Sequence, residues 1–382
     1  MRLLLPAVLL ALALWTFAAL AALPFADWPA LPLHPAQMET GQILLAFGLM
    51  PRGVVALLAG GCLGLAGALM QAVLRNPLAD PTTLGTASGA QLALVAATIF
   101  APGLLAGGAL PVALAGAAAV TLPVLALGAR RGFAPVTVTI SGMLAGMLCA
   151  AVATALTLAQ GHYLLSLVIW NGGALTQQDW SGPGHLALAL AAGLMLTALL
   201  ARPLMVLSLG AEGARGLGLG LAPLRLGTIL IAVCLSALVS AEVGLVGFVG
   251  LAAPAIARSL GARTMRARLL LAPLAGALLL SLADGALLAL AAMGGPSLPT
   301  GALTGLIGGP LLLWLLPRMA AHVPHRAEAG DRLSRRARRP GLVLAVLAAL
   351  VLALSALTLF GGRGPDGWGL FSPELRATFL PL

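Results

Sequence analysis

The sequence contains no lysine, because all 21 basic residues in its 382 positions are arginine. A phosphate-binding loop of the G-x-x-x-x-G-K type needs its lysine to reach the phosphates of a bound nucleotide. The absence of lysine therefore excludes a conventional ATPase site of this type within the sequence.

Charged residues are also scarce, at 8% of the sequence, whereas soluble globular chains contain about a quarter. Hydrophobic residues make up 60%, and the mean hydropathy is +1.05. This composition is typical of a polytopic membrane protein. The sequence pI of about 11.5 does not indicate a nucleic-acid partner, because the arginines lie at the ends of apolar runs.

Residues for catalysis or metal binding are missing as well. The three cysteines, Cys62, Cys149 and Cys234, lie inside apolar runs at spacings that fit neither a disulfide framework nor a metal site. The sequence has no H-E-x-x-H motif, no recognisable Ser-His-Asp set and no paired carboxylates within an apolar run. We therefore expect no enzyme activity, no metal and no cofactor.

Eleven apolar stretches approach the roughly 20 residues that a helix needs to cross a bilayer. They cover 3–24, 53–73, 87–101, 104–128, 136–159, 186–207, 226–241, 245–260, 269–293, 302–320 and 340–360. The first run exceeds the core of a signal peptide, so we expect it to be an uncleaved helix. The pattern predicts an all-α fold, with ten helices in one bundle and an eleventh helix after it.

The arginines predict the orientation of these helices. With the N-terminus inside, 18 of the 21 arginines fall in cytoplasmic segments, and only Arg52, Arg363 and Arg376 remain outside. Positive residues favour the cytoplasmic side of a membrane protein. We therefore expect a multi-pass protein with a cytoplasmic N-terminus, and the same asymmetry explains the high pI.

One polar segment interrupts the apolar pattern. Arg75–Gly85 reads R-N-P-L-A-D-P-T-T-L-G between two membrane-grade stretches, and its prolines, asparagine and aspartate stop a helix. Lipid cannot satisfy a broken backbone. The segment is therefore predicted to lie at the membrane surface or to line a site filled by protein or water.

Asp284 is the one acidic residue well inside an apolar stretch, while Glu242 lies at the end of another. An acid at membrane depth is a functional candidate, and a proton relay is one interpretation. A role in helix packing is the other. We favour the structural role, because no histidine or lysine lies within the spans to pair with Asp284.

Glycines recur at close spacing in the second span, at Gly60, Gly61, Gly64 and Gly67, which predicts close helix approach. A different glycine-rich stretch, Gly210–Arg225, is too polar to be buried in a membrane. We expect it to form two short helices on the cytoplasmic membrane face, suited to docking a partner. A plain connecting loop is the alternative.

Several segments in consistent order resemble the FecCD family, the permease subunits of ATP-driven importers for ferric siderophores, haem and cobalamin. They are Pro51–Gly61, Gly67–Gly85, Ile169–Trp180, Gly213–Leu219, Val246–Pro254, Leu282–Asp284 and Gly308–Arg318. The P-T-T-L-G segment followed by S-G-A-Q-L, and the T-Q-Q-D-W segment, are most similar to the double-length members that transport ferric hydroxamates.

The resemblance implies an inner-membrane permease for ferric hydroxamates that works by alternating access. Its expected partners are cytoplasmic ATP-binding subunits, a periplasmic substrate-binding protein, a second permease half and membrane lipid, with no nucleic acid. Another iron chelate, haem or cobalamin remains an alternative cargo. A proton-coupled secondary transporter that uses Asp284 is the alternative from a different class.

The resemblance also implies roles for individual residues. The ATPase-coupling loop would contain Glu212, Gly213, Arg215, Gly216 and Gly218, and the cytoplasmic gate candidates are Asn76, Pro77, Thr83, Pro135 and Thr137. Arg52 would help to dock the binding protein. Leu49 stands where the first arginine of the family pattern R-x-P-R is expected, which weakens or redistributes that contact.

The order of the segments predicts three parts. Residues 1–320 would form one complete permease half, residues 321–339 a cytoplasmic arginine-rich linker, and residues 340–382 the first helix and outside segment of an incomplete second half. The repeat is indicated by two similar arrangements, each with arginine before an apolar run and tryptophan and proline after it. A single additional helix is the alternative.

Overall fold

The computed structural model describes residues 4–22, 39–130, 135–159, 172–208, 210–296, 298–306, 308–310, 361–364 and 367–370. The chain forms two compact units, Met1–Ala321 and His322–Leu382. In the second unit, β1 (Gly361–Gly364) pairs with β2 (Gly367–Leu370) in an antiparallel hairpin. The sequence pattern did not predict this hairpin, and the expected helix over 340–360 lies outside the described residues.

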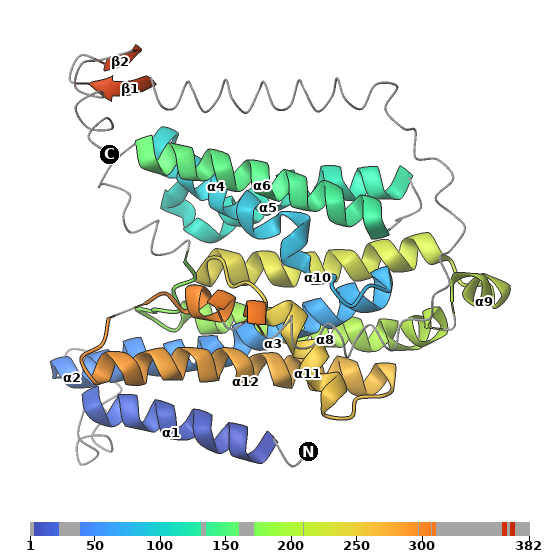
Figure 1. The fold of residues 1–382 in the computed structure, drawn as a ribbon, viewed down its shortest axis with the longest axis horizontal. Helices are drawn as coiled ribbons and strands as arrows, with labels where there is room; N and C mark the ends of the chain where they lie inside the picture. The colour runs from blue at the N-terminus through green and yellow to red at the C-terminus, as the bar shows by residue number, and fades with distance from the viewer. Residues whose placement is uncertain are drawn as a thin grey trace. The chain divides into compact units, whose positions relative to one another are not determined.

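The first unit is a helical bundle, which confirms the all-α prediction for this part of the chain (Figure 1). Its described helices are α1 (Leu4–Ala22), α2 (Thr40–Ile43), α3 (Met50–Leu74), α4 (Thr86–Phe100), α5 (Ala109–Arg130), α6 (Pro135–Ala159), α8 (Ser181–Leu207), α9 (Ala211–Gly216), α10 (Leu221–Val243), α11 (Val249–Ser259) and α12 (Met265–Ala292). A π-helical stretch, Leu44–Leu49, joins α2 to α3, and 3₁₀ turns cover Pro81–Leu84 and Pro102–Gly107.

Six helical stretches among the described residues are long and apolar enough to cross a membrane. They are Thr40–Leu74, Ala109–Arg130, Thr137–Leu158, Ser181–Leu207, Leu221–Val243 and Met265–Ala292. Two further apolar helices, Pro6–Ala21 and Thr86–Phe100, are shorter. The second span begins earlier than the predicted residue 53, because the chain is already helical from Thr40.

A continuous helix over 245–260 is also wrong. Only Val249–Ser259 is helical, and its 11 residues reach roughly 16 Å at about 1.5 Å per residue. The preceding residues are not helical, and Gly244 and Phe248 have positive φ angles of 76° and 66°. Helix α11 alone therefore reaches only about half of a hydrocarbon core of about 30 Å.

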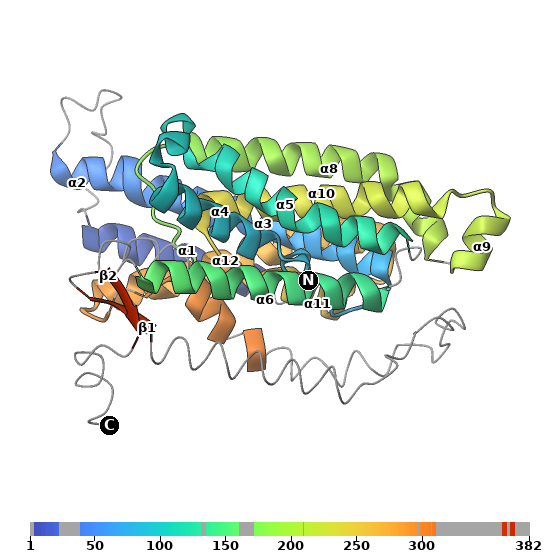
Figure 2. The same ribbon diagram turned by 90° about the horizontal axis from the view of Figure 1, so that it is seen from above.

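Helix α3 is the centre of the bundle and packs against α8, α10, α11 and α12 (Figures 1 and 2). Its glycines permit backbone contact. A Cβ added at Gly60 or Gly64 would collide with carbonyl oxygens of α12, and one at Gly67 would collide with the carbonyl oxygen of Gly250 in α11. This confirms the close helix approach that the glycine spacing predicts.

Substituting Gly67 with alanine should destabilise the bundle strongly. The added Cβ meets the backbone of Gly250, which cannot rotate away as a side chain can, so we expect a loss of about 3 kcal/mol. The matched control is Gly227→Ala in α10, where a Cβ has open space, and this variant should be neutral or slightly more stable. Thermal unfolding in detergent measures both variants, and equal melting temperatures would contradict the packing argument.

Candidate functional site

The chemically distinctive groups of the bundle lie at its two ends. Figures 1 and 2 show α9 projecting from one end and α2 at the opposite end. The interrupted segment 75–85 follows α3 at the α9 end, and Arg52 begins α3 at the α2 end. The two groups of candidate residues are therefore separated by the length of the bundle.

The interrupted segment is ordered by its own polar side chains. Asp80 is 1% exposed, and its carboxylate accepts a hydrogen bond from the Thr82 hydroxyl at 2.7 Å. The Thr83 hydroxyl donates to the Asp80 carbonyl at 2.6 Å, and the Asn76 side chain accepts from the Leu78 backbone N–H. Local bonds of this kind replace those that a helix would have made.

The end of this segment packs against α6 in the interior of the bundle. A Cβ at Gly142 would lie 2.6 Å from the Thr83 carbonyl oxygen, and one at Gly146 would lie 3.1 Å from the Cα of Gly85. Gly146 is the twelfth residue of α6, roughly 16 Å from its start. The segment thus extends into the bundle beside α6, as predicted for a broken backbone that lines a protein-filled site.

A cleft of about 270 Å³ lies beside this contact. It is bordered by Thr82, Thr83 and Ser88 from the interrupted segment and α4, by one face of α6, and by the non-helical residues before α11. The lining residues from the last two elements are Gly142, Met143, Gly146, Met147, Ala150, Leu245 and Gly247. Both helix breaks therefore border one cleft, with hydroxyl groups on one side and methionines on the other.

The predicted gate residues divide between the cleft and its surroundings. Thr83 lines the cleft, whereas Asn76 and Pro77 are half-buried near the end of α3. Pro135 begins α6, and Thr137 lies in its first turn, where its carbonyl accepts a hydrogen bond from Ser141. The structure brings Thr83 beside α6 but shows no direct contact between Thr83 and Thr137.

Cysteines at positions 83 and 137 test whether this region moves. The background should replace Cys149 and Cys234, while Cys62 is buried and can remain. If the chain is part of the ATP-driven importer that the sequence resemblance implies, the reactivity of both introduced cysteines toward a polar thiol reagent should change when ATP is added. A cysteine at the open position Gly103 is the control and should label equally in both states. Constant labelling at 83 and 137 would contradict gating.

The glycine-rich stretch 210–225 contains one short helix, α9, and the first residues of α10. The expectation of two short helices is therefore wrong. Pro223 lies in the first turn of α10, where proline is tolerated, so the helix starts before it. Ala214 anchors α9 in the bundle, while Gly213, Arg215 and Gly216 are exposed. Gly218 is also exposed, and Glu212 lies within α9.

At the opposite end, Arg52 and Asp284 form a bidentate ion pair. Arg52 Nε and Nη2 donate to the two oxygens of Asp284 at 2.8 and 2.7 Å, and the Thr300 hydroxyl donates to Asp284 Oδ1 at 2.5 Å. Asp284 is fully buried, and the Arg52 side chain is 15% exposed. The sequence did not predict this partner of Asp284, because only a histidine or lysine within the spans was expected as the cation. The cation is instead an arginine at the end of a span.

Neighbouring contacts tie other helices together at the same end. The Trp15 indole N–H donates to the Ser281 hydroxyl at 3.1 Å and so joins α1 to α12. His185 and Glu242 lie 2.8 Å apart between α8 and α10. Hydrogen bonds from Ser181 hold the pKa of the exposed Asp179 below its usual value. Within the described residues, no three acidic, cysteine or histidine side chains gather as metal ligands would.

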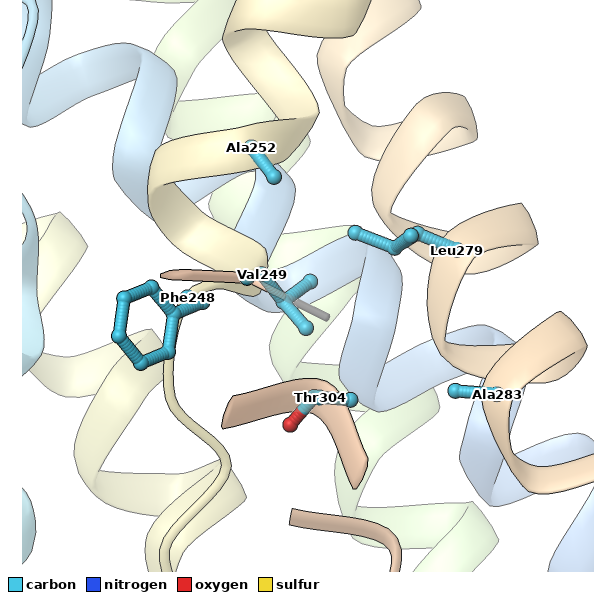
Figure 3. Close-up of a pocket in the computed structure, with 7 residues that line it drawn as sticks. Phe248, Val249, Ala252, Leu279, Ala283 and Thr304 are labelled. Carbon is cyan, nitrogen blue, oxygen red and sulfur yellow. The ribbon is translucent and has the colours of Figure 1, made fainter. Parts of the chain in front are cut away.

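A second, much smaller cavity of about 20 Å³ lies between α11, α12 and the two residues Thr304 and Gly308 (Figure 3). Phe248, Val249, Ala252, Leu279 and Ala283 line it with Thr304, whose hydroxyl already donates to the Gly301 carbonyl. The space holds about one water molecule and offers it few polar partners. This cavity is a packing gap rather than a ligand site.

Comparison with known proteins identifies relatives of the whole bundle. The sequence pattern described as the FecCD transport family matches residues 5–318. The iron(3+)-hydroxamate import system permease protein FhuB of Salmonella typhimurium is 41% identical over 362 residues, which cover 94% of this chain and 52% of that protein. FhuB of Escherichia coli is 40% identical over 98% of this chain and 58% of its own length.

The vitamin B12 import system permease protein BtuC of Salmonella typhi is 37% identical over 71% of this chain and 82% of its own length. Among solved structures, one described as an inward-facing conformation of a putative metal-chelate type ABC transporter has a TM-score of 0.65 at 24% identity. It covers 83% of this chain and 99% of its own, and it shares the fold. This chain spans just over half the length of the two FhuB relatives.

Proposed function

Because this chain belongs to the FecCD transport family, we propose that it is the transmembrane permease subunit of an ATP-driven importer for ferric hydroxamate siderophores. The observation that carries this cargo is the 40–41% identity to iron(3+)-hydroxamate permeases over nearly the whole chain. Both relatives are permease proteins and not enzymes, so we assign the chain no chemistry on its cargo.

The cleft between the two helix breaks supports alternating access. The interrupted segment precedes α4, and the non-helical residues 244–248 precede α11, so both can change backbone conformation without unwinding a complete helix. Hydroxyl groups and backbone in such a cleft can contact the polar surface of an iron chelate. We assign the cytoplasmic gate to this region, with Thr83 on the cleft wall and Asn76, Pro77, Pro135 and Thr137 around it.

The contact with the second permease half is assigned to the outer face of α6. Met143, Leu144, Met147 and Leu148 are all exposed on this helix, and Met143 and Met147 also line the cleft. A second bundle that covers this face would close the open side of the cleft and enlarge it into a path between two halves. The large apolar side chains of α6 would then contact both the second bundle and the cargo.

The two ends of the bundle are assigned to the two other partners. With the N-terminus in the cytoplasm of an inner-membrane protein, the exposed α9 contacts the ATP-binding subunits, and the α2 end faces the periplasmic binding protein. Docking through Arg52 has a condition that the sequence did not reveal. Its guanidinium is already bound to Asp284, so an acidic residue of the binding protein must compete with that carboxylate.

The proton-coupled carrier is less well supported. Asp284 would have to release and accept protons during transport, yet it is fully buried and bound to Arg52 and Thr300. Protonation would leave the guanidinium without its counter-ion, which is costly at low exposure. The geometry favours the role in helix packing.

The cargo is tested by uptake of labelled compounds in cells that lack their own permeases for them. The chain is expressed with the ATP-binding subunit, the binding protein and a second permease half, and cells receive a ferric hydroxamate, a ferric catecholate, haem or cobalamin. We expect accumulation of the hydroxamate only. Uptake of cobalamin at an equal or higher rate would indicate a cobalamin permease instead.

A further inference from the structure

Four arginines gather where α11 ends and α12 begins. Arg258 lies in the last turn of α11, Arg263 lies in the connection, and Arg266 and Arg268 lie in the first turn of α12. The sequence from residue 243 to residue 283 contains no aspartate or glutamate. The N-terminus of a helix carries a partial positive charge, so cations there add to an unfavourable potential.

Two of these arginines make hydrogen bonds within the bundle, and the other two are exposed. Arg258 donates to the Gln71 side chain at 2.7 Å, and Arg268 donates to the Ala262 carbonyl at 3.3 Å. Arg263 and Arg266 are exposed, and within the described part of the chain neither has a carboxylate partner. The cluster therefore has excess positive charge directed at its surroundings.

Exposed apolar side chains, which would face lipid, follow Arg266 along α12. Arg266, Leu270 and Leu274 are spaced by four residues and so lie along one face of α12. Leu270 is 66% exposed and Leu274 is 57% exposed. An apolar stripe that ends in an arginine matches the acyl chain and headgroup of one phospholipid.

Helix α1 leaves this part of the stripe open. Further along the same face of α12, Ser281 is hydrogen-bonded to Trp15, so α1 covers that half. Figure 1 shows α1 and α12 diverging toward the N-terminal end of both helices. Leu270 and Leu274 are the exposed residues of this face one and two turns after Arg266.

We propose that Arg263 and Arg266 bind the phosphate headgroup of an acidic phospholipid whose acyl chain lies along Leu270 and Leu274 of α12. An acidic surface of the ATP-binding subunits is the competing partner for these arginines. The apolar stripe favours the lipid, because a soluble subunit cannot cover residues at membrane depth. The proposal requires only that the bundle spans a bilayer, and it does not depend on the cargo.

The test measures lipid binding to the purified full chain in dodecyl maltoside micelles. Fluorescent phosphatidylglycerol and phosphatidylcholine are titrated separately, and we expect the acidic lipid to bind at least tenfold more tightly. The R263Q/R266Q variant should lose roughly 30-fold of the affinity for phosphatidylglycerol, from about 1 kcal/mol per arginine. The matched control R130Q/R202Q removes the same charge from exposed positions on α5 and α8 and should change binding less than twofold.

Folding is checked in the same micelles without acidic lipid. The R263Q/R266Q variant should melt no lower than the unmodified chain, because it removes cations from a helix N-terminus. The R263K/R266K variant keeps the charge and should keep the lipid preference. Equal loss in R263Q/R266Q and R130Q/R202Q, or equal binding of both lipids, would overturn the proposal. Competition by millimolar inorganic phosphate would assign a free-anion site instead, and loss of ATPase association alone would assign a protein partner.

Discussion

Replacing Asp284 with alanine is expected to lower the free energy of unfolding of the bundle by about 3–5 kcal/mol. The substitution leaves the Arg52 guanidinium at 15% exposure without its carboxylate, and the Thr300 hydroxyl loses its acceptor. Arg52→Ala should cost a similar amount, because it leaves a fully buried carboxylate without a cation. Denaturant unfolding in detergent, monitored by near-UV circular dichroism, measures both single variants.

The double variant Arg52→Met/Asp284→Leu separates packing from proton transfer. Removing both charges together leaves no unpaired ion, so stability should return to within about 1–2 kcal/mol of the unmodified chain. If the pair only joins α3 to α12, this variant should still import cargo when ATP is supplied. A folded double variant with no uptake would support an ionisable role for Asp284, or a docking role for Arg52. Asp284→Asn should then separate these two roles, because it removes the ionisable carboxyl group and retains Arg52.

Substituting Gly216 with leucine is expected to abolish ATP-driven uptake while leaving the bundle folded. Gly216 is exposed at the end of α9, and a Cβ there meets no atom within 4 Å. A bulky side chain therefore disturbs only a partner that docks on this surface. Uptake, membrane content and association with the ATP-binding subunit are measured together, and we expect association to fall at least tenfold.

The neighbouring glycine needs separate treatment. Gly218 has a φ of 77°, which a leucine would adopt only with strain, so a defect at this position mixes docking with folding. Gly103→Leu is the better control, since it adds the same side chain at an open position in the 3₁₀ turn between α4 and α5. Normal uptake and association with Gly216→Leu would rule out α9 as the coupling surface.

The long apolar helices could be predicted from the sequence because length and hydropathy decide them locally. The span over 245–260 could not be predicted in the same way. Its residues are apolar throughout, and the helix break depends on the positive φ of Phe248 and on the contact of Phe248 with Gly308. Glycine and valine in that segment are compatible with either conformation, so tertiary packing determines which one forms.

The ion pair shows a second limit. Arg52 and Asp284 are each candidates in the sequence, but with separate roles, because they are 232 positions apart. The predicted topology placed both toward the outward ends of their spans, and this shared depth was the signal for their pairing. Thr300 had no such signal, since a threonine beside a proline is common in loops. The arginines at the start of α12 likewise indicated only the orientation of the helices in the membrane.

The proposed function requires that this chain form the path of an ATP-driven importer, and transport into sealed vesicles tests this requirement. Proteoliposomes would contain the chain with a second permease half and the ATP-binding subunits, and binding protein loaded with labelled ferric hydroxamate would be supplied at the α2 face. We predict accumulation that requires ATP at the α9 face and continues when a protonophore removes the pH gradient. Accumulation driven by a pH gradient without ATP, and lost in Asp284→Asn, would show a proton-coupled carrier instead.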